Sequence, residues 1–226
     1  MSIPLFFRRY CLFTLLLAAA GPEPLQAQTD LVRAGQTSLP AWPPVALASP
    51  LTPSGDRSAD IRILEYLAEH RTPGQTTFWR AVSDANNYVN IAIPTGLLVA
   101  GIIRNDEPMR QNALYIASST AVTALVNYAI KQLVKRPRPF VTHVDFTPVY
   151  RPGQYSFPSG HSSAAFSSAI ALSRAYPRWY VIAPSLLWAG ATAYSRMYLG
   201  VHYPSDVAGG ILLGGGTAFA MGFLRP

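Results

Sequence analysis

The chain has 226 residues, of which half are apolar and 13% are charged, with a net charge of +7 and a single cysteine. That length suits one domain with a substantial core, and one cysteine excludes an internal disulfide and a cysteine-rich metal site. The basic residues form no long run and no amphipathic stripe, which argues against a nucleic-acid partner. Long stretches without charge favour a membrane protein instead.

Residues 1–27 have the pattern of an export signal. Two arginines give a positive start, an apolar run covers residues 11–20, and Ala27 is a suitable cleavage point. An uncleaved N-terminal anchor fits the same residues, and both interpretations place the segment after residue 27 outside the cytoplasm. Residues 28–58 are rich in Pro, Ala, Ser and Gly without a helical or strand period, so we expect a flexible linker.

The remaining residues, 59–226, are predicted to form one domain. Residues 59–70 are amphipathic at helical spacing, with Ile61, Leu64 and Leu67 on one face. The turn at residues 72–74 is expected to end this helix, and a second amphipathic piece covers about 76–88. Five apolar segments without charges follow as predicted spans: 89–103, which contains one proline, 111–130, 161–173, 179–195 and 207–224. Several are shorter than the ~20 residues that cross a bilayer, so flanking turns of helix must extend them.

The charges around these spans are unevenly distributed. If residue 88 lies outside, five arginines fall at cytoplasmic ends, as the positive-inside rule requires. Six cations fall outside and break that rule: Lys131, Lys135, Arg136, Arg138, Arg151 and Arg196. A bound anion would explain such cations, although Lys135 and Arg136 are interpreted as surface or lipid-headgroup contacts. In the last span, glycines at 209, 210, 214, 215 and 216 are predicted to allow close helix packing.

Three short stretches fall on this outer side, each beside a predicted helix end. They are Lys131-x6-Arg138-Pro139, Pro158-Ser159-Gly160-His161 and Ser195-Arg196-x5-His202-x3-Asp206. Their cations suit phosphate, because arginine binds its oxygens in a forked manner and lysine acts as a point charge. Ser159-Gly160 opens a helix, whose first N–H groups attract an anion that glycine lets approach closely. Together these residues predict a phosphate-binding cradle that uses no metal.

Two histidines add catalysis to this cradle. Of His161 and His202, one neutral imidazole can attack phosphorus and the other can protonate the leaving oxygen. Asp206, about one turn from His202, is suited to hold a ring N–H and to stabilise the imidazolium, as in a Ser-His-Asp triad. Pro204 is expected to start the last helix, which would put Asp206 in its first turn.

The three stretches resemble the signature of the type 2 phosphatidic acid phosphatase (PAP2) superfamily, KxxxxxxRP, PSGH and SRxxxxxHxxxD, at every fixed position. The resemblance runs from about residue 59 to 224 and is sharpest after residue 131. It implies an all-α bundle of about five to six mostly transmembrane helices, a phosphohistidine intermediate, and neither metal nor cofactor. It also implies His202 as nucleophile, Asp206 as its partner and His161 as the acid, with phosphate ligands Lys131, Arg138, Ser159, Gly160 and Arg196.

The leading hypothesis is a phosphatase that hydrolyses a lipid phosphate or lipid diphosphate, with its active site on the periplasmic face of the bacterial inner membrane. A soluble periplasmic acid phosphatase and a vanadium-dependent haloperoxidase are the alternative enzymes. A membrane protein that retains phosphorylated lipids without turnover is an alternative of another class, and the presence of both histidines and Asp206 argues against it. Phosphatidylglycerol phosphate, phosphatidate, undecaprenyl diphosphate and phosphorylated lipid A are all open as substrates. Residues 59–88 and 140–157 are predicted to set that choice.

Overall fold

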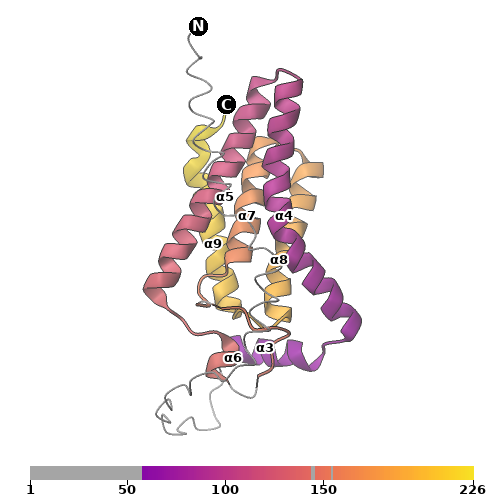
Figure 1. Cartoon of the computed structure of the whole chain (residues 1–226), viewed down its shortest axis with the longest axis vertical. Helices are drawn as coiled ribbons and strands as arrows, with labels where there is room; N and C mark the ends of the chain where they lie inside the picture. Colours follow the sequence, from indigo (N-terminus) through magenta and orange to yellow (C-terminus); the bar gives the residue numbers. More distant parts are fainter. Residues whose placement is uncertain (1–57, 144–145, 154) are drawn as a thin grey trace, which may run out of the picture. The chain divides into compact units, whose positions relative to one another are not determined.

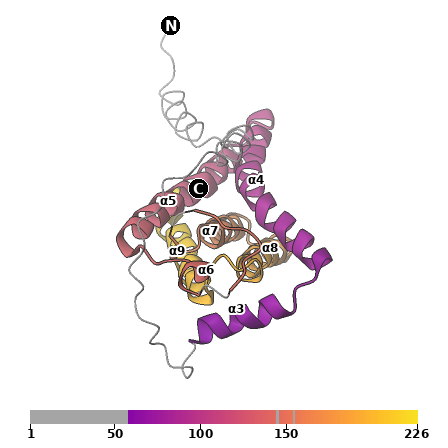
Figure 2. The same ribbon diagram turned by 60° about the horizontal axis from the view of Figure 1, so that its bottom comes forward.

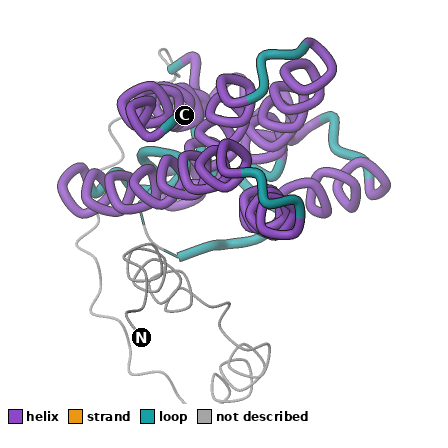
Figure 3. The backbone as a smooth tube through the Cα atoms, turned by 90° about the horizontal axis from the view of Figure 1, so that it is seen from above, coloured by secondary structure: helices purple, strands orange, loops and turns teal. Residues whose placement is uncertain are grey.

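The computed structural model describes residues 58–143, 146–153 and 155–226, and the regular structure within them is entirely helical (Figures 1 and 3). The predictions for residues 1–27, and for the linker up to residue 57, lie outside the described residues. The elements are α3 (Ala59–Glu69), α4 (Pro73–Ile103), α5 (Glu107–Val134), α6 (Pro139–Thr142), α7 (Gly160–Ala175), α8 (Trp179–Tyr198), α9 (Pro204–Ala220) and a 3₁₀ turn, η1 (Met221–Leu224). The predicted all-α bundle is confirmed.

Helix α7 is the centre of the bundle, because α5, α8 and α9 all pack along it (Figure 2). Its buried positions are serine and alanine, so its neighbours approach closely. On α9, a Cβ at Gly210 would lie 2.7 Å from the carbonyl oxygen of Ser159, and one at Gly214 would overlap the carbonyl oxygen of Ser163. The predicted close packing of the last helix is confirmed, except at Gly216, whose Cβ would face no atom within 4 Å.

Three helical stretches of the described chain are long and apolar enough to cross a membrane: residues 73–103, 107–142 and 204–224. Two of the five predicted spans, the helices α7 and α8, do not belong to this set. Helix α7 has only 16 residues, and its Ser167 and Ser168 hydroxyls bond to threonines of α5. Because other helices cover α7, it needs no apolar surface of its own.

Helix α4 is continuous where the sequence predicted an amphipathic piece at 76–88 and a separate span from 89, so that boundary was wrong. Thr72 caps its start by accepting a hydrogen bond from Gln75 N at 3.3 Å. Pro73 fills the first turn, where a missing N–H is tolerated. Pro94 lies inside the helix and does not end it, as membrane helices allow. One helix therefore joins the apolar middle of the bundle to its polar end.

Helices α3 and α6 lie across that polar end of the bundle (Figure 2). The predicted amphipathic helix is confirmed as α3, whose Ile61 and Leu64 are fully buried in a cluster with Phe140 and Tyr203, while Leu67 is half-buried. This packing holds α3 against the segments that follow α5 and precede α9.

Candidate active site

The three predicted motifs meet at the end of the bundle that α3 and α6 cover (Figures 1 and 2). Helices α5 and α8 finish there and α7 and α9 begin there, so each motif sits at a helix end. A cavity of about 530 Å³, named here the outer cavity, is lined by Lys131, Arg138, Gly160, His161, Arg196 and His202. The two other predicted residues, Ser159 and Asp206, are fully buried beside it.

Backbone carbonyls hold two of the cations in the outer cavity. Lys131, in the last turn of α5, donates to the carbonyl oxygen of Tyr155 at 2.7 Å. Arg138 donates through Nη1 to Val201 O at 2.6 Å and through Nη2 to Gly153 O at 3.0 Å. These contacts orient both cations without placing a negative charge on them. Within the described part of the chain, no group of three or more His, Cys, Asp or Glu side chains could hold a metal ion.

Arg196, the third predicted cation, is 2% exposed in the last turn of α8. Its Nη1 donates to the hydroxyl of Ser83 on α4. Its guanidinium also lies 5.7 Å from the centre of the Tyr150 ring. Arg196 is thus fixed between the start of α4 and the loop before α7, with its charge toward the outer cavity.

The His202 ring lies in the turn between α8 and α9 and is 2% exposed. Its Nδ1 is 3.6 Å from Asp206 Oδ2, and its Nε2 is 3.3 Å from Arg138 Nη1. Burial lowers the pKa of His202 to about 3, although hydrogen bonding to Asp206 raises it. The ring is therefore neutral at neutral pH, with Nδ1 toward a carboxylate and Nε2 toward the cations.

Asp206 is held in one orientation by several donors. The predicted helix start at Pro204 is confirmed, and it places Asp206 in the first turn of α9. There, Oδ2 accepts hydrogen bonds from Tyr203 N at 2.9 Å and from the Ser156 hydroxyl, while Oδ1 accepts from Arg136 Nη1 at 2.7 Å. A carboxylate with this many partners cannot easily turn away from His202.

Arg136 is part of the site, so its interpretation as a surface or headgroup contact was wrong. Besides Asp206, its guanidinium binds Ser205 Oγ at 2.7 Å and Asp60 Oδ2 on α3 at 3.0 Å. It also lies 4.1 Å from the centre of the Tyr203 ring. The sequence carried no signal for this contact, because Asp60 is 76 residues away from Arg136.

The second motif forms the start of α7, as predicted. Ser159 precedes the helix, and its N–H donates to the Asp206 carbonyl oxygen at 3.0 Å. Gly160 and His161 follow in the first turn and line the outer cavity. The His161 carbonyl oxygen accepts from Asn86 Nδ2 at 3.5 Å, which ties this turn to α4. First-turn N–H groups have no partner within their own helix, so they are available to an anion.

Several residues of the outer cavity were missed by sequence reasoning. They come from α4, α5 and the loop before α7, outside the three motifs: Arg80, Asp84, Asn87, Asn127 and Tyr150. The polar face of residues 76–88 was the only signal for those on α4, and that signal does not distinguish a cavity wall from a solvated helix face.

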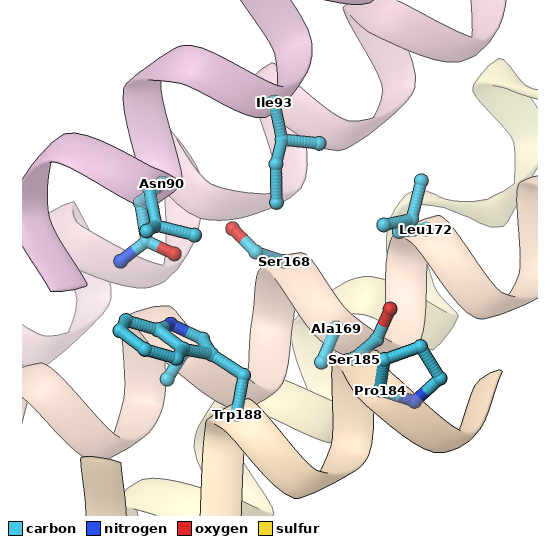
Figure 4. Close-up of a pocket in the computed structure, with 10 residues that line it drawn as sticks. Asn90, Ile93, Ser168, Ala169, Leu172, Pro184, Ser185 and Trp188 are labelled. Carbon is cyan, nitrogen blue, oxygen red and sulfur yellow. The ribbon is translucent and has the colours of Figure 1, made fainter. Parts of the chain in front are cut away.

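A second cavity of about 190 Å³, named here the inner cavity, lies among α4, α7 and α8 (Figure 4). Its walls are mostly apolar and include Ile93, Ala169 and Leu172. Two polar atoms in its walls, Asn90 Oδ1 and Trp188 Nε1, are buried without a hydrogen-bond partner among the described residues. None of the described residues that line this cavity is charged, so it offers no cation to a phosphate.

Several relatives that match this chain in sequence or fold are named as phosphatases. The PAP2 superfamily model matches residues 112–223. The undecaprenyl-diphosphatase BcrC of Bacillus subtilis is 30% identical over 137 residues, which are 61% of this chain and 67% of that protein. The decaprenylphosphoryl-5-phosphoribose phosphatase of Mycolicibacterium smegmatis is 31% identical over 159 residues, which are 70% of this chain and 82% of that protein. The chain belongs to the PAP2 superfamily.

Other relatives match over less of their length. The putative undecaprenyl-diphosphatase YbjG of Escherichia coli is 36% identical over 107 residues, so the chain spans 52% of that protein. Among solved structures, the transmembrane PAP2-type phosphatidylglycerolphosphate phosphatase from Bacillus subtilis superimposes with a TM-score of 0.61 and 26% identity, over 73% of this chain and 84% of that one. That likeness and the three apolar stretches identify a membrane protein.

Proposed function

We propose that the chain is a phosphatase that hydrolyses a lipid phosphate or lipid diphosphate through a phosphohistidine on His202. The observation that carries this proposal is a single cavity that contains both His161 and His202 together with the three predicted cations. A neutral imidazole is a nucleophile, and the cations can stabilise the charge that a phosphoryl group carries in its transition state.

The first step forms a bond between His202 Nε2 and phosphorus and breaks the bond from phosphorus to the leaving oxygen. Burial and the nearby cations lower the pKa of His161 in the empty cavity, and the negative charge of the bound phosphate raises it again, so that His161 enters the step protonated. His161 then gives its proton to the leaving oxygen, and the lipid leaves as an alcohol or as a monophosphate. Asp206 stabilises the positive ring of His202, in the manner of the aspartate in a Ser-His-Asp triad. Lys131, Arg138 and Arg196 bind the phosphoryl oxygens.

The second step removes the phosphoryl group from the enzyme. His161, now neutral, accepts a proton from water, and the water oxygen attacks phosphorus. The bond from phosphorus to Nε2 of His202 then breaks, inorganic phosphate leaves, and the neutral imidazole is restored. The start of α7 offers the backbone N–H groups of Gly160 and His161, which line the outer cavity, to the phosphoryl oxygens throughout.

We also infer that the substrate is a lipid and that the outer cavity faces the periplasm of a bacterial inner membrane. Three membrane-length apolar stretches support the lipid, and the relatives with which the chain aligns are named for phosphorylated lipids or their phosphatase activity on them. The cavity lies at the end where α4 starts and α5 finishes, and arginines gather at the opposite helix ends: Arg104, Arg110, Arg174 and Arg178. Arginines on that side are typical of the cytoplasmic face.

The test is the variant His202→Ala, purified in detergent and assayed for phosphate release from lipid phosphates. We expect turnover to fall by about a thousandfold or more, because the nucleophile is lost. Wild-type protein quenched during turnover in alkaline detergent should carry radiolabelled phosphate, and the variant should carry none.

His70→Ala is the matched control, because His70 is exposed just after the end of α3 and does not line the outer cavity. It should keep wild-type turnover and labelling. Substantial turnover by His202→Ala, or labelling of that variant equal to wild type, would remove His202 as the nucleophile.

A further inference from the structure

The outer cavity has room for more than one phosphate. Its volume is about 530 Å³, whereas the five heavy atoms of a phosphate need roughly 150 Å³ if each takes a water's share of liquid volume, about 30 Å³. Lys131, Arg138 and Arg196 surround His202 and already provide for one phosphoryl group. A fourth cation, Arg80 of α4, lines the same cavity and belongs to none of the three motifs.

Arg80 is held on the cavity wall by its neighbours. Its Nε donates to Asp84 Oδ2 at 2.9 Å, and its guanidinium lies 3.8 Å from the centre of the Tyr150 ring. The same ring contacts the guanidinium of Arg196 at 5.7 Å. Since Asp84 engages Nε, the two terminal nitrogens of Arg80 are the donors that can reach a ligand in the cavity.

The position of Arg80 along α4 places it nearer the mouth of the cavity than Arg196. Arg196 contacts Ser83 on α4, and Arg80 is three residues earlier on that helix, which is about 5 Å closer to its outer end. The Arg80 side chain is 42% exposed, whereas Arg196 is buried. A phosphoryl group at His202 would therefore have Arg80 on its solvent side.

We propose that Arg80 binds the second phosphate of a lipid diphosphate, the one that stays on the lipid, and so makes lipid diphosphates the preferred substrates. This subsite rests on the proposed function. The terminal phosphorus lies at His202, the bond from it to the bridging oxygen breaks, and that oxygen leaves with the electron pair on the lipid monophosphate. Arg80 neutralises the charge that the departing phosphate gains, which a lipid monophosphate substrate would not place there.

A pair such as Arg80 and Asp84, four residues apart on an exposed helix face, is common and contributes little to stability. What distinguishes Arg80 is its place in the cavity wall and its contact with Tyr150. Specificity between two substrates, rather than stability or total activity, is therefore the quantity to measure.

The experiment compares farnesyl diphosphate with farnesyl monophosphate, which share a chain and differ by one phosphate, using the full chain in detergent. We expect wild type to have the higher kcat/KM for the diphosphate. Arg80→Gln should lower kcat/KM for the diphosphate about tenfold or more and change kcat/KM for the monophosphate less than about twofold. Arg80→Lys should recover part of the preference for the diphosphate, because lysine restores the positive charge but not the two-point hydrogen bonding of a guanidinium.

Turnover of the monophosphate by Arg80→Gln serves as an internal check on folding. Arg62→Gln, which removes an exposed cation on α3 outside the cavity, should leave both substrates unaffected. If Arg80→Gln lowers kcat/KM equally for both substrates, or for neither, the second-phosphate subsite is wrong but the proposed phosphatase activity is unaffected. If wild type hydrolyses neither substrate nor any other lipid phosphate, the proposed function itself fails.

Discussion

The outer and inner cavities share three helices and yet differ in chemistry. Helix α4 supplies Asn87 to the outer cavity and Asn90 to the inner one, and α7 supplies His161 to the outer and Ala165 to the inner. On α4 and α7 the change takes place within about one turn, roughly 5 Å. The change from apolar to charged cavity walls is therefore abrupt, and it lies at one end of the bundle.

The helix ends are the reason for this difference. Loop carbonyls from Gly153, Tyr155 and Val201 hold Lys131 and Arg138 in the outer cavity, and such groups are free only where helices stop. In the middle of the bundle the carbonyls are engaged within helices, and a cation beside lipid would cost about 2.5–3.5 kcal/mol or more. The position along a helix thus decides which chemistry its side chains can support.

Among residues outside the walls of the outer cavity, Arg136 is expected to have the largest effect on catalysis. Arg136→Gln takes a cation from the buried carboxylate of Asp206, which then holds His202 less well. We expect kcat to fall roughly tenfold or more with little change in KM, because Arg136 binds Asp206 and does not line the cavity. Steady-state kinetics on one lipid phosphate would measure both constants.

Asp60 allows the same contact to be tested from α3. Asp60→Asn should lower kcat less than Arg136→Gln, and the double variant should be no worse than Arg136→Gln alone, because the two residues act through one contact. Glu69→Gln, an exposed position on α3, is the control and should match wild type. Additive losses, or a rise in KM instead of a fall in kcat, would contradict a positioning role.

Acid should destabilise the outer cavity through His202. Burial lowers its pKa to about 3 in the folded chain, against about 6.5 when unfolded. Between these values the unfolded chain binds more protons, so the stability that this neutral ring contributes is fully present above about pH 6.5 and is lost as pH falls. Burial sets most of this effect, the contact with Asp206 opposes it, and the nearby charges of Arg196 and Arg138 add to it.

Thermal unfolding in detergent at pH 7 and pH 4.5 would measure this dependence. The variant His202→Gln removes the titrating group, and its unfolding temperature should fall less between the two pH values than that of wild type. Equal falls in both proteins would mean that His202 titrates normally in the folded chain.

The inner cavity should show the smallest effects. Replacing Asn90, whose Oδ1 is buried without a partner, by Leu should leave stability unchanged or raised and turnover within about twofold of wild type. Asn86→Leu, one turn nearer the outer cavity, removes the hydrogen bond to the His161 carbonyl oxygen and should lower turnover several-fold. If both variants lose turnover equally, the inner cavity belongs to the active site.

Most of the helices could be predicted because their signals are local. Ile61 and Leu64 fall at helical spacing and are buried together, and Pro204 starts α9 as its fixed φ favours. The boundary within α4 could not be predicted, because the change from amphipathic to apolar residues near 88 alters what surrounds the helix and leaves its backbone hydrogen bonds intact. The short, serine-rich α7 lacks the length and apolar composition of a membrane-crossing helix taken alone for a related reason, since its neighbours supply its cover.

The sequence by itself determined the helices, the three motifs and the residue types that bind phosphate, because spacing along one chain controls which side chains share a helix face or flank a helix end. Only the tertiary structure decided that Arg136 joins Asp60 to Asp206 and that Arg80 shares Tyr150 with Arg196. These partners lie far apart in the chain, and their contacts depend on how whole helices pack, which no short stretch of sequence specifies.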